Sequence, residues 1–225
     1  MHLSAGAGRL TPLELPGPAG NLEALLQTRE PEEGGLTALV CHPHPRYGGT
    51  MHNKVVHAAA GALADAGLPV MRFNFRGAGL SEGRHDAGHG EQEDMRAVLD
   101  HLADRYPAAP ILVAGYSFGA FVGLKVGCGD GRVAALIGIG LPVTLYDFGF
   151  LAASARPLAI IQGDRDRFGP LPLLLAFAAT LPGGARVIPV PGAEHAFDGR
   201  LEEVAHAVAG AIPSHIIATP PPRPS

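Results

Sequence analysis

The sequence has little of several residue types, and each scarcity excludes a class of protein. Only two cysteines occur in 225 residues, and Cys41 and Cys128 are too few to build a disulfide framework. Charged residues make up 17% and the formal net charge is −4, so the composition predicts no basic surface for nucleic acid or an anionic membrane. The longest candidate membrane span, Val133–Phe150, is interrupted by glycines, Pro142 and Asp147, so we expect no membrane-spanning segment.

What the chain does have is enough apolar sequence for one core. Hydrophobic residues make up 47%, and this length suits one domain of mixed helices and strands. We expect a single domain over residues 1–218, followed by a flexible proline-rich tail over residues 219–225. The first twelve residues lack the apolar stretch of a signal peptide, so the predicted location is the cytoplasm.

Strand-like and helix-like segments alternate along the chain, which is typical of a mainly parallel sheet with helices on both faces. The predicted strands are Leu22–Thr28, Leu36–His42, Leu68–Phe75, Pro110–Tyr116, Val133–Ile139, Leu158–Gln162 and Arg186–Val190, with a weaker one near Leu10–Leu15. The predicted helices are Met51–Ala66, Glu91–Arg105, Ser117–Val126, Pro170–Leu181 and Leu201–Ile212. In such sheets, chemistry is expected at the carboxyl ends of the strands.

One serine has the sequence context of a nucleophile. Gly115–Gly119 reads G-Y-S-F-G, the single G-x-S-x-G of the chain. It follows a buried strand and opens a helix rich in small residues, as a sharp strand-to-helix turn requires. The alternative is a glycine-rich turn that Ser117 merely caps. We predict that Ser117 is the nucleophile.

A serine nucleophile needs a base, and the base needs a carboxylate that orients it. Two carboxylates, Asp164 and Asp166, follow the strand that ends at Gln162. Asp164 is placed to hold its own turn together, so we predict Asp166 as the acid. His195 lies on the last loop before the final helix and is the predicted base. The order Ser…Asp…His along the chain is typical of one fold in particular.

Acyl transfer also needs backbone N–H groups that stabilise the oxyanion. One donor should be Phe118, the residue after the nucleophile. The other should come from the loop HPHPRYGG, where prolines have no N–H. His44 is the best placed remaining donor, with Arg46 and Tyr47 as alternatives behind it. A second histidine group, His85 and His89, lies with Asp86 on a glycine-rich loop. Since no third ligand of fixed geometry is evident, we expect no metal and no other cofactor.

Taken together, these motifs resemble those of the α/β-hydrolases, specifically the small, lidless, dienelactone-hydrolase-like group. The segments that carry the resemblance are HPHPRYGGTMHNKVV (42–56), RFNFRGAGLSEG (72–83), GYSFGA (115–120), QGDRD (162–166) and GAEHAF (192–197). The resemblance implies a twisted sheet of about eight strands and a Ser117–Asp166–His195 triad. Dienelactone hydrolases use a cysteine nucleophile, and Ser117 stands here instead, so dienelactone is not the expected substrate.

The segment between residues 140 and 157 is where larger relatives insert a lid, and it is short here. An open site predicts that the protein is a serine hydrolase whose substrate, and only expected partner, is a small or short-chain carboxylic ester. Thioesters and lactones are alternative substrates of the same triad, and a non-catalytic binding protein is the alternative from another class. The candidate substrate-binding residues are Tyr47, Met51, Leu141, Phe148 and Phe168. For Leu141 and Phe148, plain packing in the core is an equally good explanation.

Overall fold

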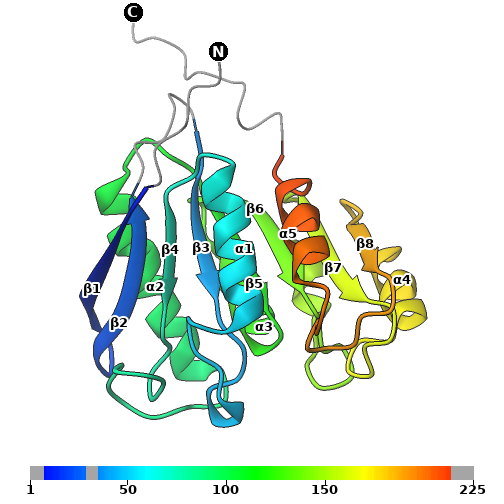
Figure 1. Cartoon of the computed structure of the whole chain (residues 1–225), viewed down its shortest axis with the longest axis horizontal. Coiled ribbons are helices and arrows are strands. Elements are labelled where there is room, and N and C mark those ends of the chain that lie inside the picture. The colour runs from blue at the N-terminus through cyan, green and yellow to red at the C-terminus, as the bar shows by residue number, and fades with distance from the viewer. Residues whose placement is uncertain (1–7, 29–34, 214–225) are drawn as a thin grey trace, which may run out of the picture.

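The computed structural model describes residues 8–28 and 35–213, and these contain one eight-stranded sheet (Figure 1). The strands run in the order β1-β2-β4-β3-β5-β6-β7-β8. Their bounds are β1 Arg9–Gly17, β2 Gly20–Thr28, β3 Thr37–Cys41, β4 Val70–Phe73, β5 Ile111–Tyr116, β6 Val133–Ile139, β7 Leu158–Gly163 and β8 Arg186–Val190. All eight predicted strands are therefore present. The predicted tail at residues 219–225 lies outside the described residues.

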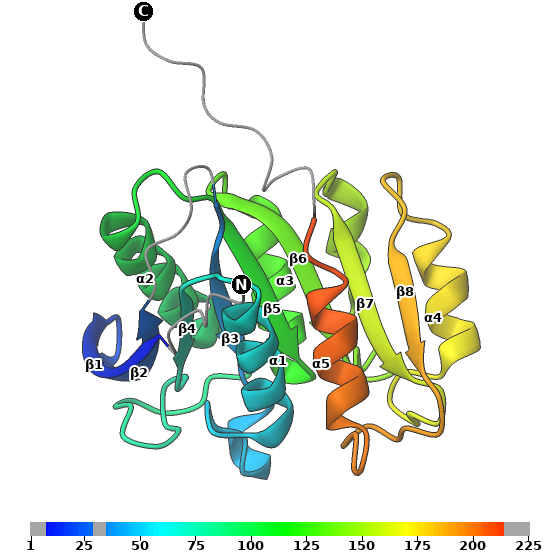
Figure 2. The ribbon, with the colours of Figure 1, turned by 45° about the horizontal axis from the view of Figure 1, so that its top comes forward.

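Helices cover both faces of the sheet. They are α1 Lys54–Asp65, α2 His89–Arg105, α3 Phe118–Gly129, α4 Leu171–Ala178 and α5 Leu201–Ala209. In Figures 1 and 2, α1 and α5 lie in front of the sheet, and their apolar side chains form one core with that face. The apolar side chains of α2, α3 and α4 form the other core with the opposite face. The predicted α/β-hydrolase architecture is confirmed.

The central strands are buried on both sides, which explains their nearly continuous apolar sequences. Every residue of β3, β4, β5 and β7 is buried, and β3 to β8 pair in parallel throughout. At one edge, β1 and β2 form the antiparallel ribbon that the alternation of Leu22, Ala24 and Leu26 predicts. These three side chains are buried, because a sheet edge covered on one face needs apolar residues only at alternate positions.

Two helices begin two or three residues away from the start that the sequence predicts. The predicted start of α1 at Met51 is wrong, because Asn53 caps the helix through its side chain, which accepts the N–H of Val55 at 2.9 Å. The second helix, α2, starts two residues earlier than predicted, at His89, after Gly88 in the left-handed conformation (φ 96°). Met51 therefore lies in the loop before α1, and residues 85–88 lie in the loop before α2.

The parallel strands deliver their following loops to one edge of the sheet, the lower edge in Figure 1. The loops after β3, β5, β7 and β8 all lie there, because strands of one direction end on the same side. The segment between β6 and β7 contains only the short 3-10 helix η2, Gly149–Ala153, so this sheet has no lid at that position. Across the two described ranges, no helix is long and apolar enough to cross a membrane.

Candidate active site

Ser117 stands on a strained turn between β5 and α3. Its backbone has φ 57° and ψ −118°, a conformation that side chains rarely adopt and that clusters at functional sites. The turn is held by the Ser117 N–H, which donates to Ile139 O at 2.9 Å. The flanking glycines leave no space for a side chain, since a Cβ on Gly115 would meet Gly119 O at 2.3 Å and one on Gly119 would meet Cys41 O at 2.4 Å. The G-x-S-x-G spacing is therefore a steric requirement of this turn.

His195 and Asp166 form a hydrogen-bonded chain with Ser117. His195 Nε2 lies 2.9 Å from Ser117 Oγ, and His195 Nδ1 lies 2.7 Å from Asp166 Oδ2. Because the carboxylate accepts the Nδ1–H, the lone pair of Nε2 faces the serine hydroxyl. The structure thus brings together the three residues that the sequence predicts, from the turn after β5 and the loops after β7 and β8.

The Asp166 carboxylate is surrounded by donors. Asp166 is only 2% exposed, and besides the imidazole it accepts the Gln162 Nε2–H at 2.8 Å and the Phe168 N–H at 2.9 Å. Asp164, the alternative acid, is exposed and accepts the Gly192 N–H at 2.7 Å. That bond ties the loop after β7 to the loop after β8, which is the structural role that its position at the turn predicts.

Two further side chains hold the site, and sequence reasoning missed both. Gln162 Nε2 donates to Asp166 and to Gly169 O, while its Oε1 accepts the Leu141 N–H. The Tyr116 hydroxyl donates to His195 O at 2.9 Å, and burial raises the pKa of this phenol well above its usual range. The available signals were a glutamine that ends the apolar run LAIIQ and a tyrosine directly before the serine.

The two predicted oxyanion residues lie side by side. The rings of His44 and Phe118 are 4.9 Å apart between centroids, and Gly119 of α3 packs against Cys41 O and His42 O, just before His44. Within the part of the chain that the structure describes, neither the His44 N–H nor the Phe118 N–H donates to a protein acceptor. Phe118 opens α3, and the N-terminus of a helix favours negative charge.

His42 has a structural role in this loop. Its Nδ1–H donates to Pro43 O at 2.6 Å, and its Nε2 accepts the Phe75 N–H at 2.9 Å. Both ring nitrogens of the neutral tautomer are thereby satisfied. Burial lowers the pKa of His42 to about 4, so the ring is neutral at pH 7 and joins the end of β3 to the end of β4.

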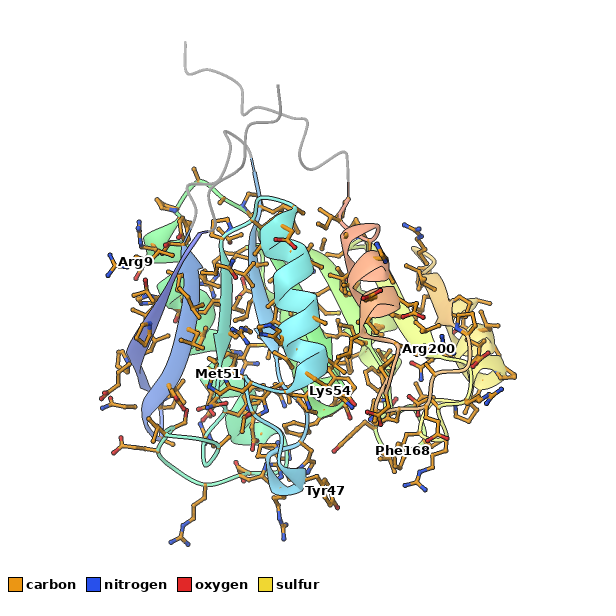
Figure 3. All side chains as sticks on the ribbon, in the orientation of Figure 1. Arg9, Tyr47, Met51, Lys54, Phe168 and Arg200 are labelled. Carbon is orange, nitrogen blue, oxygen red and sulfur yellow. The ribbon has the colours of Figure 1, made fainter. Side chains whose placement is uncertain are left out.

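Of the five predicted substrate-binding residues, two lie at the open edge. Figure 3 shows Tyr47 and Phe168 at the lower edge of the molecule. Tyr47 is 88% exposed, and the half-buried Phe168 packs against His195 with ring centroids 4.9 Å apart. Phe168 therefore forms one wall beside the proposed base.

Met51 and Leu141 lie beneath the surface instead. Their exposed fractions are 1% and 0%, so neither side chain presents a surface to a substrate. Met51 is fixed by its backbone, because its N–H donates to Asn74 Oδ1 at 2.7 Å and its carbonyl accepts from Arg72 Nη1 at 2.9 Å. Leu141 packs in the core beneath the site.

A hollow of about 500 Å³ lies next to the site, and the buried Phe148 is among its lining residues. Its apolar lining also includes Val143, Tyr146, Leu173 and Phe177. Its walls do not include Ser117 or His195.

Two contacts connect the hollow to the reaction centre. Tyr146 approaches the ring of Phe118 at 6.0 Å between centroids. Thr144 Oγ1 donates to Phe168 O at 2.9 Å. The segment 143–149 therefore extends from the nucleophile side of the site to the histidine side.

The histidines of the glycine-rich loop do not gather metal ligands. His85 Nδ1 lies 2.6 Å from Glu91 Oε1. Throughout residues 8–28 and 35–213, no three histidine, cysteine, aspartate or glutamate side chains are grouped to hold a metal ion. The absence of a metal and of other cofactors from the reaction stays a prediction.

An eight-stranded sheet with a serine on a strained turn after β5 defines the class of α/β-hydrolases. A family model described as serine aminopeptidase, S33, matches residues 38–144. A serine hydrolase homologue from Coxiella burnetii is 36% identical, with a TM-score of 0.83 over 95% of this chain and 100% of that one. XC6422 from Xanthomonas campestris, a serine hydrolase without a lid, is 35% identical, with a TM-score of 0.86 over 94% and 97% of the two chains.

The chain therefore belongs to the α/β-hydrolase superfamily, as the motifs predict. It is also similar to the uncharacterized protein RP471 of Rickettsia prowazekii, with 41% identity over 154 residues. That similarity spans 67% of this chain and 64% of the rickettsial protein, which is less than two thirds of its length. Family and fold support a hydrolase, and the particular bond that it cleaves is addressed next.

Proposed function

We propose that the protein hydrolyses carboxylic esters through an acyl-enzyme on Ser117. The observation that carries the proposal is the hydrogen-bonded chain from Ser117 Oγ through His195 to Asp166, with contacts of 2.9 Å and 2.7 Å. A serine hydroxyl becomes nucleophilic when a neighbouring imidazole accepts its proton, and a buried carboxylate orients that imidazole.

In the first half-reaction, Ser117 Oγ attacks the acyl carbon while its proton passes to His195 Nε2. The negative charge that develops on the carbonyl oxygen is stabilised by the N–H groups of Phe118 and His44. The imidazolium then protonates the departing alcohol, which leaves an ester on Ser117. Asp166 remains ionised and keeps Nδ1 protonated.

In the second half-reaction, neutral His195 removes a proton from water, which attacks the acyl-enzyme. The tetrahedral intermediate uses the same two N–H groups, and its collapse returns the proton to Ser117 Oγ and releases the carboxylic acid. The reaction is balanced with ester and water as the substrates, so this mechanism assigns no step to a cofactor.

Small or short-chain esters are the proposed substrates. No lid encloses the site between β6 and β7, and the adjoining hollow offers apolar walls at Val143, Tyr146 and Leu173 for part of the substrate. Structures of an esterase with a similar fold, Est1E from Butyrivibrio proteoclasticus, include one with ferulic acid bound, but it is 19% identical and shares the fold alone. Thioesters and lactones would use the same residues.

Hydrolysis of p-nitrophenyl acetate and butyrate by the full chain tests the proposal. Ser117→Ala should lower kcat by several orders of magnitude while the protein stays folded. A matched thioester, a lactone and an aminoacyl p-nitroanilide separate esterase from thioesterase, lactonase and aminopeptidase activity. Undiminished ester cleavage by Ser117→Ala, or no cleavage by the wild type, would contradict the proposal.

A further inference from the structure

A buried carboxylate lies close to the proposed site and has no part in the mechanism above. The Glu91 side chain is fully buried in the first turn of α2. Its Oε1 accepts the Asp86 N–H at 2.9 Å and its Oε2 accepts the Gly88 N–H at 2.8 Å. A buried carboxylate needs such donors, so the glycine-rich loop before α2 closes around Glu91.

The same carboxylate anchors an imidazole. His85 Nδ1 lies 2.6 Å from Glu91 Oε1, a close contact that does not have the geometry of a hydrogen bond. The His85 side chain is 14% exposed. A mostly buried ring in close contact with a buried carboxylate, on a loop closed by two hydrogen bonds to that carboxylate, has little freedom to move.

The anchored ring contacts both residues whose N–H groups would stabilise the oxyanion. The ring centroids of His85 and His44 are 4.5 Å apart, and those of His85 and Phe118 are 5.5 Å apart. His44 and Phe118 contact each other at 4.9 Å. The three rings come from the loop after β3, the loop after β4 and the start of α3, so three separate segments meet at one point.

We infer that His85, anchored by Glu91, is a positioning residue that fixes the spacing between the His44 and Phe118 N–H groups. This inference rests on the proposed function, since it assigns both N–H groups to the oxyanion. His85 does not contact the reacting atoms in this account. It acts through its neighbours, because a displacement of about 1 Å at a site can cost on the order of 100-fold in rate.

A simpler role would be stabilisation of the loop alone, since Glu91 also forms the capping contact of α2. The two roles differ in what they predict for the transition state. Loss of loop stability lowers the melting temperature and the folded fraction. Loss of N–H spacing lowers kcat per folded molecule and weakens binding of a tetrahedral oxyanion to the same degree.

The experiment compares His85→Ala, which removes the ring, with His85→Phe, which keeps a ring against His44 and Phe118. His89→Ala is the matched control, because His89 is an exposed histidine four residues further along. The probe is a short-chain alkyl trifluoromethyl ketone, whose carbonyl carbon bonds Ser117 Oγ to give a hemiketal oxyanion. Initial rates on p-nitrophenyl acetate are expressed per active site, and melting temperatures are recorded alongside.

We expect His85→Ala to lower kcat/KM about 10- to 100-fold, with most of the loss in kcat and an equal loss of ketone affinity. His85→Phe should recover most of both, and His89→Ala should match the wild type. Should His85→Ala lose cooperative unfolding, His85→Leu takes its place. The inference would be overturned if the ring-deleted variant bound the ketone as tightly as the wild type does. It would also be overturned if His85→Phe recovered neither kcat/KM nor ketone affinity relative to the ring-deleted variant. Failure of the wild type and His89→Ala to cleave the ester would instead overturn the proposed function.

Discussion

At the scale of single residues, the candidate site depends on hydrogen bonds that orient its side chains. Asp166 is an acceptor facing three donors, and Tyr116 fixes the backbone of His195 by a bond to its carbonyl. Gln162 has its amide oxygen on Leu141 N–H and its amide nitrogen on Asp166. Together these bonds hold the imidazole in one orientation before any substrate arrives.

Replacement of the acid tests this arrangement. Asp166→Asn places an amide N–H₂ among donors, so His195 is expected to adopt the tautomer that cannot accept the serine proton. We expect kcat on p-nitrophenyl acetate to fall by about 10³- to 10⁴-fold. Asp164→Asn is the matched control and should act on loop stability with a far smaller kinetic effect. The assignment of the acid would be wrong if the two variants exchanged these effects.

At the scale of elements, the site is a product of parallel strands that end on the same side. β5 supplies the serine turn, β7 the proposed acid and β8 the proposed base, while the loop after β3 brings His44 to the start of α3. His42 links two of these strand ends, because its ring bonds both Pro43 O and the Phe75 N–H. The loop that carries a proposed oxyanion donor is therefore fixed by a buried, neutral histidine.

This histidine predicts how stability depends on pH. The folded pKa of about 4 lies below the ordinary 6.5, so between these values the unfolded chain binds more protons and acid favours unfolding. The His42 contribution is fully present above pH 6.5 and is lost as the pH falls toward 4. We expect about 2 kcal/mol of its contribution to the free energy of unfolding to be lost between pH 7.5 and 5.

Urea unfolding of the wild type and of His42→Gln at both pH values measures that loss. The variant lacks the titrating group, so its stability should decline with acid by about 2 kcal/mol less than that of the wild type. His52→Gln, at an exposed histidine on the same loop, should retain the wild-type decline. Equal pH dependence in the wild type and His42→Gln would contradict the structural role of His42.

At the scale of the whole molecule, the sheet could be predicted because each strand is recognisable from its own consecutive residues. Apolar runs such as ILVAGY and LAIIQG lie in strands covered on both faces, and the Ser…Asp…His order specifies the fold. The partners of Gln162 and Tyr116 could not be predicted in this way, since each bonds a residue from a different loop. The placement of Met51 could not be predicted for the same reason, because its backbone bonds Arg72 and Asn74, which are distant in sequence.

The open edge of the molecule also bears on specificity. The loop at 143–149 lines the hollow where larger relatives insert a lid, and Leu145 and Leu173 are 60% and 51% exposed there. The proposal of short substrates rests on this apolar surface being open to water, since long chains need enclosure. Its contacts with Phe118 and Phe168 place any bound group next to the proposed reaction centre.

The central claim is that Ser117 is an activated nucleophile, and covalent labelling measures this most directly. A fluorophosphonate reacts by losing fluoride as the serine oxygen bonds phosphorus, which requires a serine activated by a neighbouring base. The account predicts one adduct per chain, located by peptide mass spectrometry on Ser117, absent in Ser117→Ala and much slower to form in His195→Ala. A folded wild-type protein that stays unlabelled, or an adduct on any other residue, would contradict it.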